Sequence, residues 1–479
     1  MASDDSDSDS SFNSGSDASE TKLKPKILDS TPTKPQLKAL LQPTPTTGLT
    51  PLHTFIYSLT YRHLVIFSLP ILSLLGLYGT WTLGLKNGLF GSIVSLLEDP
   101  EARLPGTDEL LIRSYTGAGW LDRQLQVLVA FFAPVLDLGF GREGLFLFSL
   151  FGLGQFGAAW MVMCLEGTRV GNKGLAVSFV GTVGCIFQNI SFTVTTPIWL
   201  LVHLLTSPVS KPFSGANANS VLLIQPWDLR ILPFSITISY LLPSLLMGLP
   251  SPGVISPISH QRWIAIWQAF PMLTVMTHYL LRTAVQSIAQ RIWKEDPKIR
   301  APTPLGAEYL NNAKYVYQFI LGLCIATHVP VLLIAILPSW LFPSFSPLLS
   351  RLGRETISSV YIPYFPSLTH KLSSFAEGVH TFLLWDMYIG ATAFVLWAVL
   401  LYRNATTEKD IVDPNNSLPK YRELLAGEKG GKKEKGDKAT GKLVLKVAGW
   451  SLVGGPMAAV AVLLWQRDAV VRQKIKQGI

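Results

Sequence analysis

Charged residues are scarce in this sequence of 479 residues. Asp, Glu, Lys and Arg make up only 15% of it, whereas an ordinary globular chain is about one-quarter charged. Hydrophobic residues make up 48%. This composition excludes a soluble enzyme and a wholly disordered protein, and it indicates a membrane protein with several spans and polar ends.

Cysteines and recognisable metal motifs are also scarce. The three cysteines, Cys164, Cys185 and Cys324, lie in apolar stretches without metal-ligand spacing, so we interpret them as small buried side chains. There is no HExxH zinc helix and no GxSxG nucleophile elbow. The apolar segments contain no aspartate-rich diphosphate site, because the DDSDSDS run lies at the N-terminus. We therefore expect no metal and no cofactor.

The charge balance is basic, with 40 Lys and Arg against 31 Asp and Glu and a formal net charge of +9. These cations lie in loops beside apolar segments, as in a membrane protein that faces an anionic cytoplasmic leaflet. We therefore expect the lipid bilayer as a partner and no nucleic acid. The endoplasmic reticulum or another endomembrane is the expected location.

Composition divides the chain into four parts. Residues 1–55 form a Ser/Asp-rich and then Pro/Thr-rich tail, which we expect to be disordered. Residues 56–405 are the expected transmembrane bundle, and residues 406–446 are an expected Lys-rich cytoplasmic loop. Residues 447–479 are predicted to form a last transmembrane helix with a basic tail. The expected fold class is thus all-α, a polytopic transmembrane helix bundle of about eight spans, within a range of about seven to nine.

The expected spans are apolar runs near 20 residues, the length that crosses about 30 Å of hydrocarbon. They are Leu64–Leu83, Glu143–Leu165, Leu175–Leu205, Leu229–Leu249, Trp263–Leu281, Tyr317–Trp340, Val379–Tyr402 and Val447–Trp465. The run Gln124–Phe140 is ambiguous, since it contains Pro134 and Asp137. It fits a ninth span, a re-entrant segment or an interfacial helix, and we favour a segment packed at the interface.

An ionisable side chain within a span is costly, so each one is a candidate functional residue. The candidates are Asp122, Asp137, Glu166, His203, His380 and Asp386. Asp386 lies deepest, and a carboxyl group in apolar surroundings can stay protonated near neutral pH and act as a Brønsted acid. Asp137 and Glu166 are the alternative acids. The other interpretation of Asp386, a hydrogen bond that joins two helices, stays open.

Polar and aromatic residues accompany these candidates. The amides of Gln188 and Asn189 should point into a cavity or toward another helix, since lipid cannot satisfy them. Aromatic residues lie close to three of the acids: Trp120 near Asp122, Phe131 and Phe132 before Asp137, and Trp385 beside Asp386. Aromatic faces stabilise cations. A cavity that combines such faces with one buried acid would suit carbocation chemistry.

Four stretches carry a resemblance to a known family. In order they are RSYTGAGWLDRQLQVLVAFFAPVLD, QNISFTVTTPIWLLVHLLTSP, QRWIAIWQAFP and HTFLLWDMYIG, with Trp397 further on. Together they resemble a family of fungal integral-membrane proteins that includes the membrane-bound terpene cyclases of the ascofuranone, ascochlorin and macrophorin pathways. The resemblance implies metal-independent cyclisation of a prenylated meroterpenoid, begun by protonation of an olefin or an epoxide. The matching stretches contain Asp122, Asp137, His203, His380 and Asp386.

The leading hypothesis is therefore a membrane-bound terpene cyclase that acts on a lipophilic prenylated small molecule. The alternative is a non-enzymatic multipass membrane protein such as a small-molecule transporter. A transporter should have a water-accessible path with ionisable groups along it. A cyclase should have one apolar cavity with an acid at one wall.

Overall fold

The structure is a computed structural model that describes residues 60–105, 107–137, 142–212, 215–293, 308–342, 346–406 and 431–477. These described residues form helices and connections without a β-strand, apart from an isolated bridge between Arg103 and Leu110. The expected all-α fold class is thus confirmed. The expected tail over residues 1–55 and residues 407–430 of the expected Lys-rich loop lie outside the described residues.

The helices differ widely in length, and two π-helical segments and several single 3₁₀ turns lie among them. In chain order they are α3 (Tyr61–Leu77), the π-helix η1 (Tyr78–Thr82), α4 (Leu83–Asn87), α5 (Leu89–Glu98), α6 (Gly119–Phe132), α7 (Glu143–Gly167), η2 (Val170–Asn172), η3 (Ala176–Ser178), α8 (Val180–Asn189), α9 (Phe192–Thr206), η4 (Pro208–Ser210), α10 (Gly215–Leu222), α11 (Pro226–Ile236), the π-helix η5 (Thr237–Leu241), α12 (Leu242–Met247), α13 (Pro257–Gln268), α14 (Phe270–Trp293), α15 (Glu308–Ile336), η6 (Ser339–Leu341), α16 (Pro347–Leu352), α17 (Ile357–Tyr361), α18 (Phe375–Thr406), α20 (Gly431–Gly454) and α21 (Pro456–Gln477).

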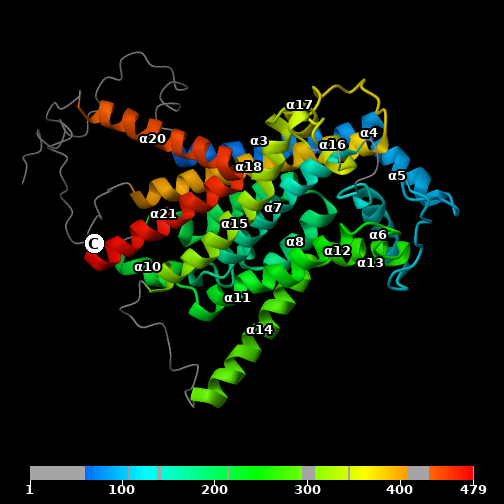
Figure 1. Cartoon of the computed structure of the whole chain (residues 1–479). Helices are drawn as coiled ribbons and strands as arrows, with labels where there is room; N and C mark the ends of the chain where they lie inside the picture. Colours follow the sequence, from blue (N-terminus) through cyan, green and yellow to red (C-terminus); the bar gives the residue numbers. More distant parts are fainter. Residues whose placement is uncertain are drawn as a thin grey trace, which may run out of the picture. The chain divides into compact units, whose positions relative to one another are not determined.

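Four helices form the core of the bundle. Helices α7, α15, α18 and α21 pack side by side, and Figure 1 shows them crossing the centre of the molecule. Helix α7 is buried on all sides along most of its length, as is α21 between Met457 and Leu464. A helix that is apolar all round is stable only where other helices or lipid surround it. In this bundle, other helices bury the apolar side chains of α7 and of this part of α21.

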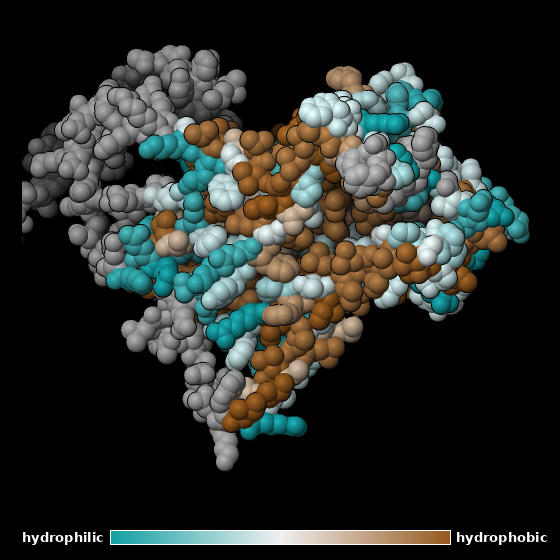
Figure 2. All heavy atoms as spheres, viewed as in Figure 1, coloured by the Kyte–Doolittle hydropathy of each residue, from teal (hydrophilic) through white to brown (hydrophobic). Residues whose placement is uncertain are grey.

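The outer helices leave large apolar side chains exposed. On α3 these are Leu64, Phe67, Ile71 and Leu74, and on α14 they are Met272, Val275, Met276, Tyr279 and Leu280. Figure 2 shows the hydrophobic surface running along α14, the helix that projects from the rest in Figure 1. Soluble monomers rarely expose apolar patches of this extent. The surface is compatible with contact to lipid.

Fewer helices than expected are long and apolar enough to cross a membrane. Within the described residues there are five, or up to six if one bent pair counts as a single span. The five are Tyr61–Asn87, Glu143–Gly167, Asn217–Met247, Tyr309–Ile336 and Phe375–Thr406, and the bent pair is Pro257–Gln268 with Phe270–Ala289, which meet at 73°. The prediction of about eight spans is therefore too high.

The expected span over Leu175–Leu205 was wrong because the chain breaks within it. Helix α8 ends at Asn189, and α9 begins at Phe192. Between them Ser191 has an extended backbone, and its Oγ accepts a hydrogen bond from Val194 N at 3.3 Å. Serine is a favoured N-cap residue, since its side chain satisfies a backbone N–H of the first turn. Two short helices replace the long span.

The expected span over Val447–Trp465 is also two helices. Helices α20 and α21 meet at Gly455, whose φ is +78°, and Pro456 opens α21. Glycine adopts this left-handed conformation easily, and proline suits the first position of a helix. The side chain of Gln155 in α7 secures the corner, because it donates to Gly454 O at 2.9 Å and accepts from Met457 N at 3.0 Å.

The ambiguous run Gln124–Phe140 begins in helix α6, which has 14 residues and is not among the candidate spans. It packs against α5 and α13 at one end of the bundle. Residues 138–140 lie outside the described residues. This short helix does not support a ninth span, and the favoured position of the segment at the interface stays a prediction.

Candidate functional site

A cavity of about 240 Å³ lies between α5, α6, α7, the junction of α8 and α9, α13 and α18. About 10–15 Å³ on the same measure holds one water molecule, so this cavity has room for an organic molecule. Most of its lining is apolar. Its aromatic residues are Trp81, Phe90, Phe131, Phe132, Phe148, Phe156, Phe187, Phe192, Tyr240, Trp267, Phe270 and Phe382.

Many of these rings touch one another, and together they form an arc around the cavity. One run of contacts joins Trp81, Phe90, Phe382, Phe131, Phe132 and Trp267, with ring centroids 5.0–6.2 Å apart. A second run continues through Phe270, Phe187, Phe192 and Phe156, at 4.9–6.0 Å. Edge and face contacts at such distances fix the orientation of each ring. The ring faces offer a cation electrostatic stabilisation without a nucleophile.

Each of the two π-helical segments contributes one of these aromatic side chains. Trp81 lies in η1 and Tyr240 lies in η5. A π-bulge changes the helical phase, and such bulges occur often at functional sites. The polar atom of each ring is satisfied, because Trp81 Nε1 donates to Ile190 O at 2.7 Å and Tyr240 OH donates to Leu153 O at 2.9 Å.

Asp386 in α18 provides the carboxyl group of the cavity wall, and its side chain is buried. Its Oδ1 accepts a hydrogen bond of 2.8 Å from the backbone N–H of Thr193, and the amide of Phe192 also bonds to the carboxylate. These amides form the N-terminus of α9, where the helix dipole favours negative charge. Among the described residues, no Lys, Arg or His forms an ion pair with Asp386.

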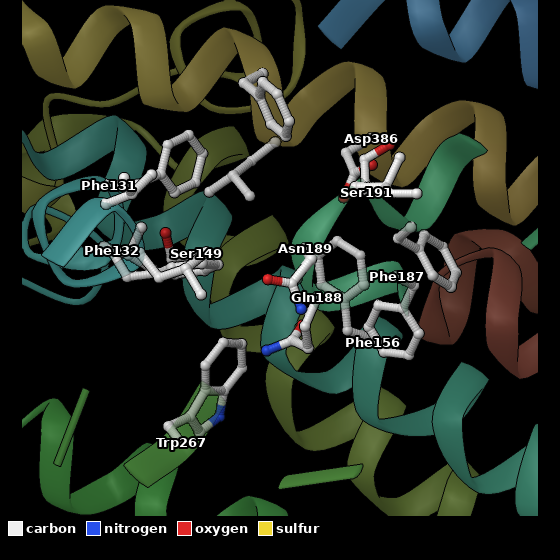
Figure 3. A pocket seen from close by; sticks show the side chains of 18 of the residues that line it. Phe131, Phe132, Ser149, Phe156, Phe187, Gln188, Asn189, Ser191, Trp267 and Asp386 are labelled. Atoms are coloured by element: carbon white, nitrogen blue, oxygen red, sulfur yellow. The ribbon is translucent and has the colours of Figure 1, made fainter. Parts of the chain in front are cut away.

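Ser191 of the α8–α9 junction lies beside this acid, and Gln188 and Asn189 lie further along the same cavity (Figure 3). Gln188 Nε2 donates to Gln268 Oε1 at 3.1 Å, which joins α8 to α13. Asn189 Nδ2 donates to Cys185 O at 2.7 Å within α8. Both residues line the cavity. The prediction that these amides face a cavity or another helix is therefore confirmed for Gln188, whereas Asn189 lines the cavity but its amide nitrogen bonds within its own helix.

Comparison with models of protein families shows to which family the chain belongs. The sequence model of the CtvD domain matches residues 65–472, which is most of the chain. The chain belongs to the CtvD-domain family. The matched region contains all the described residues that line the cavity.

Curated proteins that are similar to the chain are named terpene cyclases. Terpene cyclase ascI of Acremonium egyptiacum is 28% identical over 365 residues, which is 75% of this chain and 80% of the relative. Terpene cyclase ctvD of Aspergillus terreus is 25% identical over 401 residues, which is 83% of this chain and 97% of the relative. Terpene cyclase penA of Penicillium crustosum is 26% identical over 347 residues, with 71% and 85% covered. No solved structure matches the chain. The resemblance expected from sequence is thus confirmed.

Glu166, an alternative acid, lies in a buried ion cluster rather than at the cavity. Its carboxylate pairs with Arg169 and with Arg467, each at 2.8 Å. Asp468 pairs with the same two arginines at 3.0 and 2.8 Å, and it accepts a hydrogen bond of 2.9 Å from Tyr317 OH. Two acids and two arginines balance in charge, which a buried cluster requires. The cluster joins α7 to α21.

Asp122 organises the loop before α6. Its two carboxylate oxygens accept hydrogen bonds from Ser114 Oγ, from Thr116 Oγ1 and from the backbone amides of Tyr115, Thr116 and Gly117, at 2.7–3.0 Å. Burial opposes ionisation, but these hydrogen bonds outweigh it and hold the pKa of Asp122 well below its usual range. The carboxylate therefore stays ionised and is already fully bonded within the loop.

The remaining candidates lie outside the described lining of the cavity. Asp137 forms an ion pair of 2.7 Å with Arg142. His380 Nε2 bonds to Val360 O at 3.0 Å. His203 Nδ1 accepts from Trp397 Nε1 at 3.1 Å. Of the six candidates, the structure places Asp386 at the cavity.

Sequence reasoning found some of the aromatic lining and missed the rest. Phe131 and Phe132 line the cavity as expected from their place before Asp137. Trp120 is 79% exposed, and Trp385 packs against Gly79 outside the described lining. The sequence did not predict that Trp267, Tyr240 and Phe382 line the cavity, because nothing in their local sequence separates them from other aromatic residues. For the α8–α9 junction, the sequence did offer a signal, because Ser191 is a residue type that favours the position before the first turn of a helix.

Proposed function

We propose that the chain is an integral-membrane terpene cyclase of an endomembrane, and that it cyclises a lipophilic prenylated substrate by protonation from Asp386 without a metal. One observation carries this proposal: a single carboxyl group at the wall of an aromatic cavity. Of the described residues that line the cavity, Asp386 alone is an Asp, Glu, Lys, Arg or His. The names of the relatives support the class of reaction.

The proposed first step is a proton transfer from the carboxyl group of Asp386. Because Oδ1 accepts from the backbone amide of Thr193, we assign the proton to the other oxygen, Oδ2. The O–H bond breaks, and the proton binds to an olefinic carbon of the substrate, or to an epoxide oxygen whose C–O bond then breaks and leaves a hydroxyl group. The resulting electron-deficient carbon is attacked by a neighbouring C=C bond, which forms the ring bond and moves the cation along the chain. Loss of a proton from a carbon beside the last cation forms a C=C bond and ends the reaction, and return of one proton to the Asp386 carboxylate restores the acid.

The surroundings of Asp386 suit this step. After the transfer the carboxylate is negative, and the backbone amides at the start of α9 already point at it. Such fixed donors stabilise developing charge without reorganisation. The aromatic arc stabilises the cation through its ring faces and keeps water away from it, which prevents early hydration.

The rival function is transport. The break between α8 and α9 gives this rival some support, since discontinuous helices form the substrate sites of many transporters. A transporter also needs ionisable groups along a water-accessible path. In the described lining of the cavity, however, Asp386 is the one residue among Asp, Glu, Lys, Arg and His, and most of the other lining residues are aromatic or aliphatic. This arrangement favours chemistry on an apolar substrate.

A direct experiment separates the two functions. The purified chain is placed in liposomes with a farnesylated phenol and, separately, with its terminal epoxide, and products are followed by mass spectrometry. A cyclase gives a product of unchanged mass and altered retention. Movement of intact substrate across the bilayer, without conversion, would establish transport instead. Conversion that stops on addition of a chelator and returns with a divalent metal would overturn metal independence.

A further inference from the structure

The hydroxyl group of Ser149 in α7 is the second polar feature of the cavity that needs an explanation. Ser149 lines the cavity, is only 5% exposed, and its Oγ has no hydrogen-bond partner among the described residues. Figure 3 shows it beside Phe132, on the side of the cavity away from Asp386. A buried hydroxyl group without a hydrogen-bond partner destabilises the fold unless a ligand supplies the partner.

In α9 the buried hydroxyl groups of Thr193 and Thr196 also lack a partner among the described residues, but many other buried hydroxyl groups in the helices of this protein satisfy themselves. Each donates to the carbonyl four residues earlier, the usual solution for Ser and Thr in apolar helices. Examples are Thr80, Ser235, Ser239, Ser244, Thr274 and Thr327. For Ser149 the corresponding acceptor is the carbonyl of Leu145, and no such hydrogen bond forms. The hydroxyl of Ser149 is thus free to bond outside its own helix.

Ser149 and the acid occupy different ends of the cavity. Ser149, Gly152 and Phe156 follow one another at helical spacing on the cavity face of α7. Phe156 lies about 10 Å further along the helix axis than Ser149, at 1.5 Å per residue. The ring of Phe156 contacts that of Phe192 at 4.9 Å, and Phe192 begins the helix whose amides bond to Asp386. A molecule that reaches both ends must be longer than one isoprene unit.

We propose that Ser149 is a substrate-binding residue that determines specificity. Its hydroxyl donates a hydrogen bond to an oxygen on the head group of a prenylated substrate, so that the far end of the prenyl chain lies at Asp386. The choice of a prenylated ligand rests on the proposed function. The binding contact itself does not depend on the protonation step.

This arrangement would make the site selective for ligands that carry the oxygen, because other ligands leave the Ser149 hydroxyl without a hydrogen-bond partner. A ligand with the oxygen pairs the Ser149 hydroxyl, whereas a hydrocarbon ligand of the same shape leaves it unpaired and buried. Sites built to bond a substrate oxygen reject the analogue that lacks it for this reason. Aliphatic and aromatic contacts along the rest of the cavity would be equal for both ligands.

The test uses two probes, a farnesylated phenol and the farnesylated benzene with the same chain. Binding to the purified full chain in nanodiscs is measured by tryptophan fluorescence, since Trp81 and Trp267 line the cavity. We expect the wild-type protein to bind the phenol about fivefold more tightly, the typical worth of one hydrogen bond. In Ser149→Ala this preference should fall to near one. An unchanged preference in Ser149→Ala, or no preference in the wild type, would overturn the proposal.

The matched control is Ser235→Ala. Ser235 is also buried and helical, but it bonds to Ile231 O and His278 Nδ1 and lies outside the described lining of the cavity. This variant should keep the wild-type preference for the phenol. Thermal unfolding adds a second measurement. Ser149→Ala without ligand should unfold at the wild-type temperature or above it, because the removed hydroxyl has no partner. A clear decrease would indicate a structural role and would contradict the proposal.

These outcomes are distinguishable from failure of the proposed function. If the chain binds the phenol through Ser149 but converts neither the phenol nor its epoxide, the binding site stands and the cyclase function fails. If conversion occurs and Ser149→Ala keeps the wild-type preference, the cyclase function stands and the role of Ser149 fails.

Discussion

The backbone N–H of Thr193 donates a hydrogen bond of 2.8 Å to Oδ1 of Asp386, although 193 residues separate them in the chain. Thr193 is the second residue of α9, and Asp386 lies in α18 at the cavity wall. The bond joins the break between α8 and α9 to the deepest acid of α18. Fold and site therefore depend on the same contact.

Replacement of Asp386 by asparagine tests the proposed acid. Asp386→Asn keeps the size of the side chain and an oxygen that can accept from Thr193 N, so the variant should express and fold. It removes the proton, and we expect turnover to fall by about 10²–10⁴-fold, the usual contribution of a general acid. Product formation at equal protein level, measured by mass spectrometry, checks this expectation.

The control for that experiment is Asp137→Asn. Asp137 pairs with Arg142 and lies outside the described lining of the cavity, so turnover should stay near the wild-type level. Near-normal turnover of Asp386→Asn would move the acid role to Asp137 or Glu166. Activity in all three amide variants would refute an intramembrane carboxylic acid.

Loss of one partner from the buried ion cluster should destabilise the fold. Glu166→Gln leaves Arg169 and Arg467 with too little negative charge, and breaking a buried pair in this way costs about 3–5 kcal/mol. Thermal unfolding in detergent should show a large decrease, whereas the surface variant Lys476→Ala should not. Because Glu166 lies away from the cavity, the protein that does fold should retain its specific turnover. A stable but inactive Glu166→Gln would contradict this assignment.

The aromatic arc should control the fate of the cation. Phe382→Leu removes a ring that contacts Phe90 and Phe131 but keeps an apolar side chain. We expect a larger share of hydrated alcohols among the products, since water can reach an unprotected cation. Phe151→Leu is the control, because Phe151 is buried outside the described lining. Equal product profiles for both variants would argue against cation stabilisation by the arc.

Gly455 should tolerate no side chain at the corner between α20 and α21. Its φ is +78°, and an added Cβ would lie 2.6 Å from the Gln155 side chain. Left-handed backbone alone is unfavourable by about 1–2 kcal/mol for other residues, so Gly455→Ala should lower the unfolding temperature clearly. Gly449 lies within α20 with open space around it. Gly449→Ala should be neutral or stabilising, by up to about 1 kcal/mol. A lower unfolding temperature for Gly449→Ala than for Gly455→Ala would contradict the described backbone conformation at Gly455.

The loop held by Asp122 should respond to acid. The pKa of Asp122 in the folded protein is lower than in the unfolded chain, so its stabilising effect is complete above about pH 4. The effect disappears as the pH falls through the lower, folded value. Asp122→Asn should unfold at a lower temperature than the wild type at neutral pH, and the difference should shrink toward about pH 3. A constant difference across this range would show that ionisation is not the cause.

The sequence alone determined the class of the protein and its most deeply placed acid. Long apolar runs with few charges can be stable only as helices surrounded by lipid or by other helices, because every backbone polar group must be paired. The depth of Asp386 in such a run marked it as exceptional. These properties follow from local composition, and five of the expected runs correspond to candidate spans.

Only the tertiary structure decided which runs are continuous and which side chains meet. Hydrophobicity does not distinguish a span from two buried helices joined at a serine cap or a Gly–Pro corner, because both bury the same apolar surface. Nor does it show that Trp267, Phe382 and Ser149 face one cavity while Glu166 lies in an ion cluster. Such neighbours come from different helices, and the packing angles and phase of each helix bring them together.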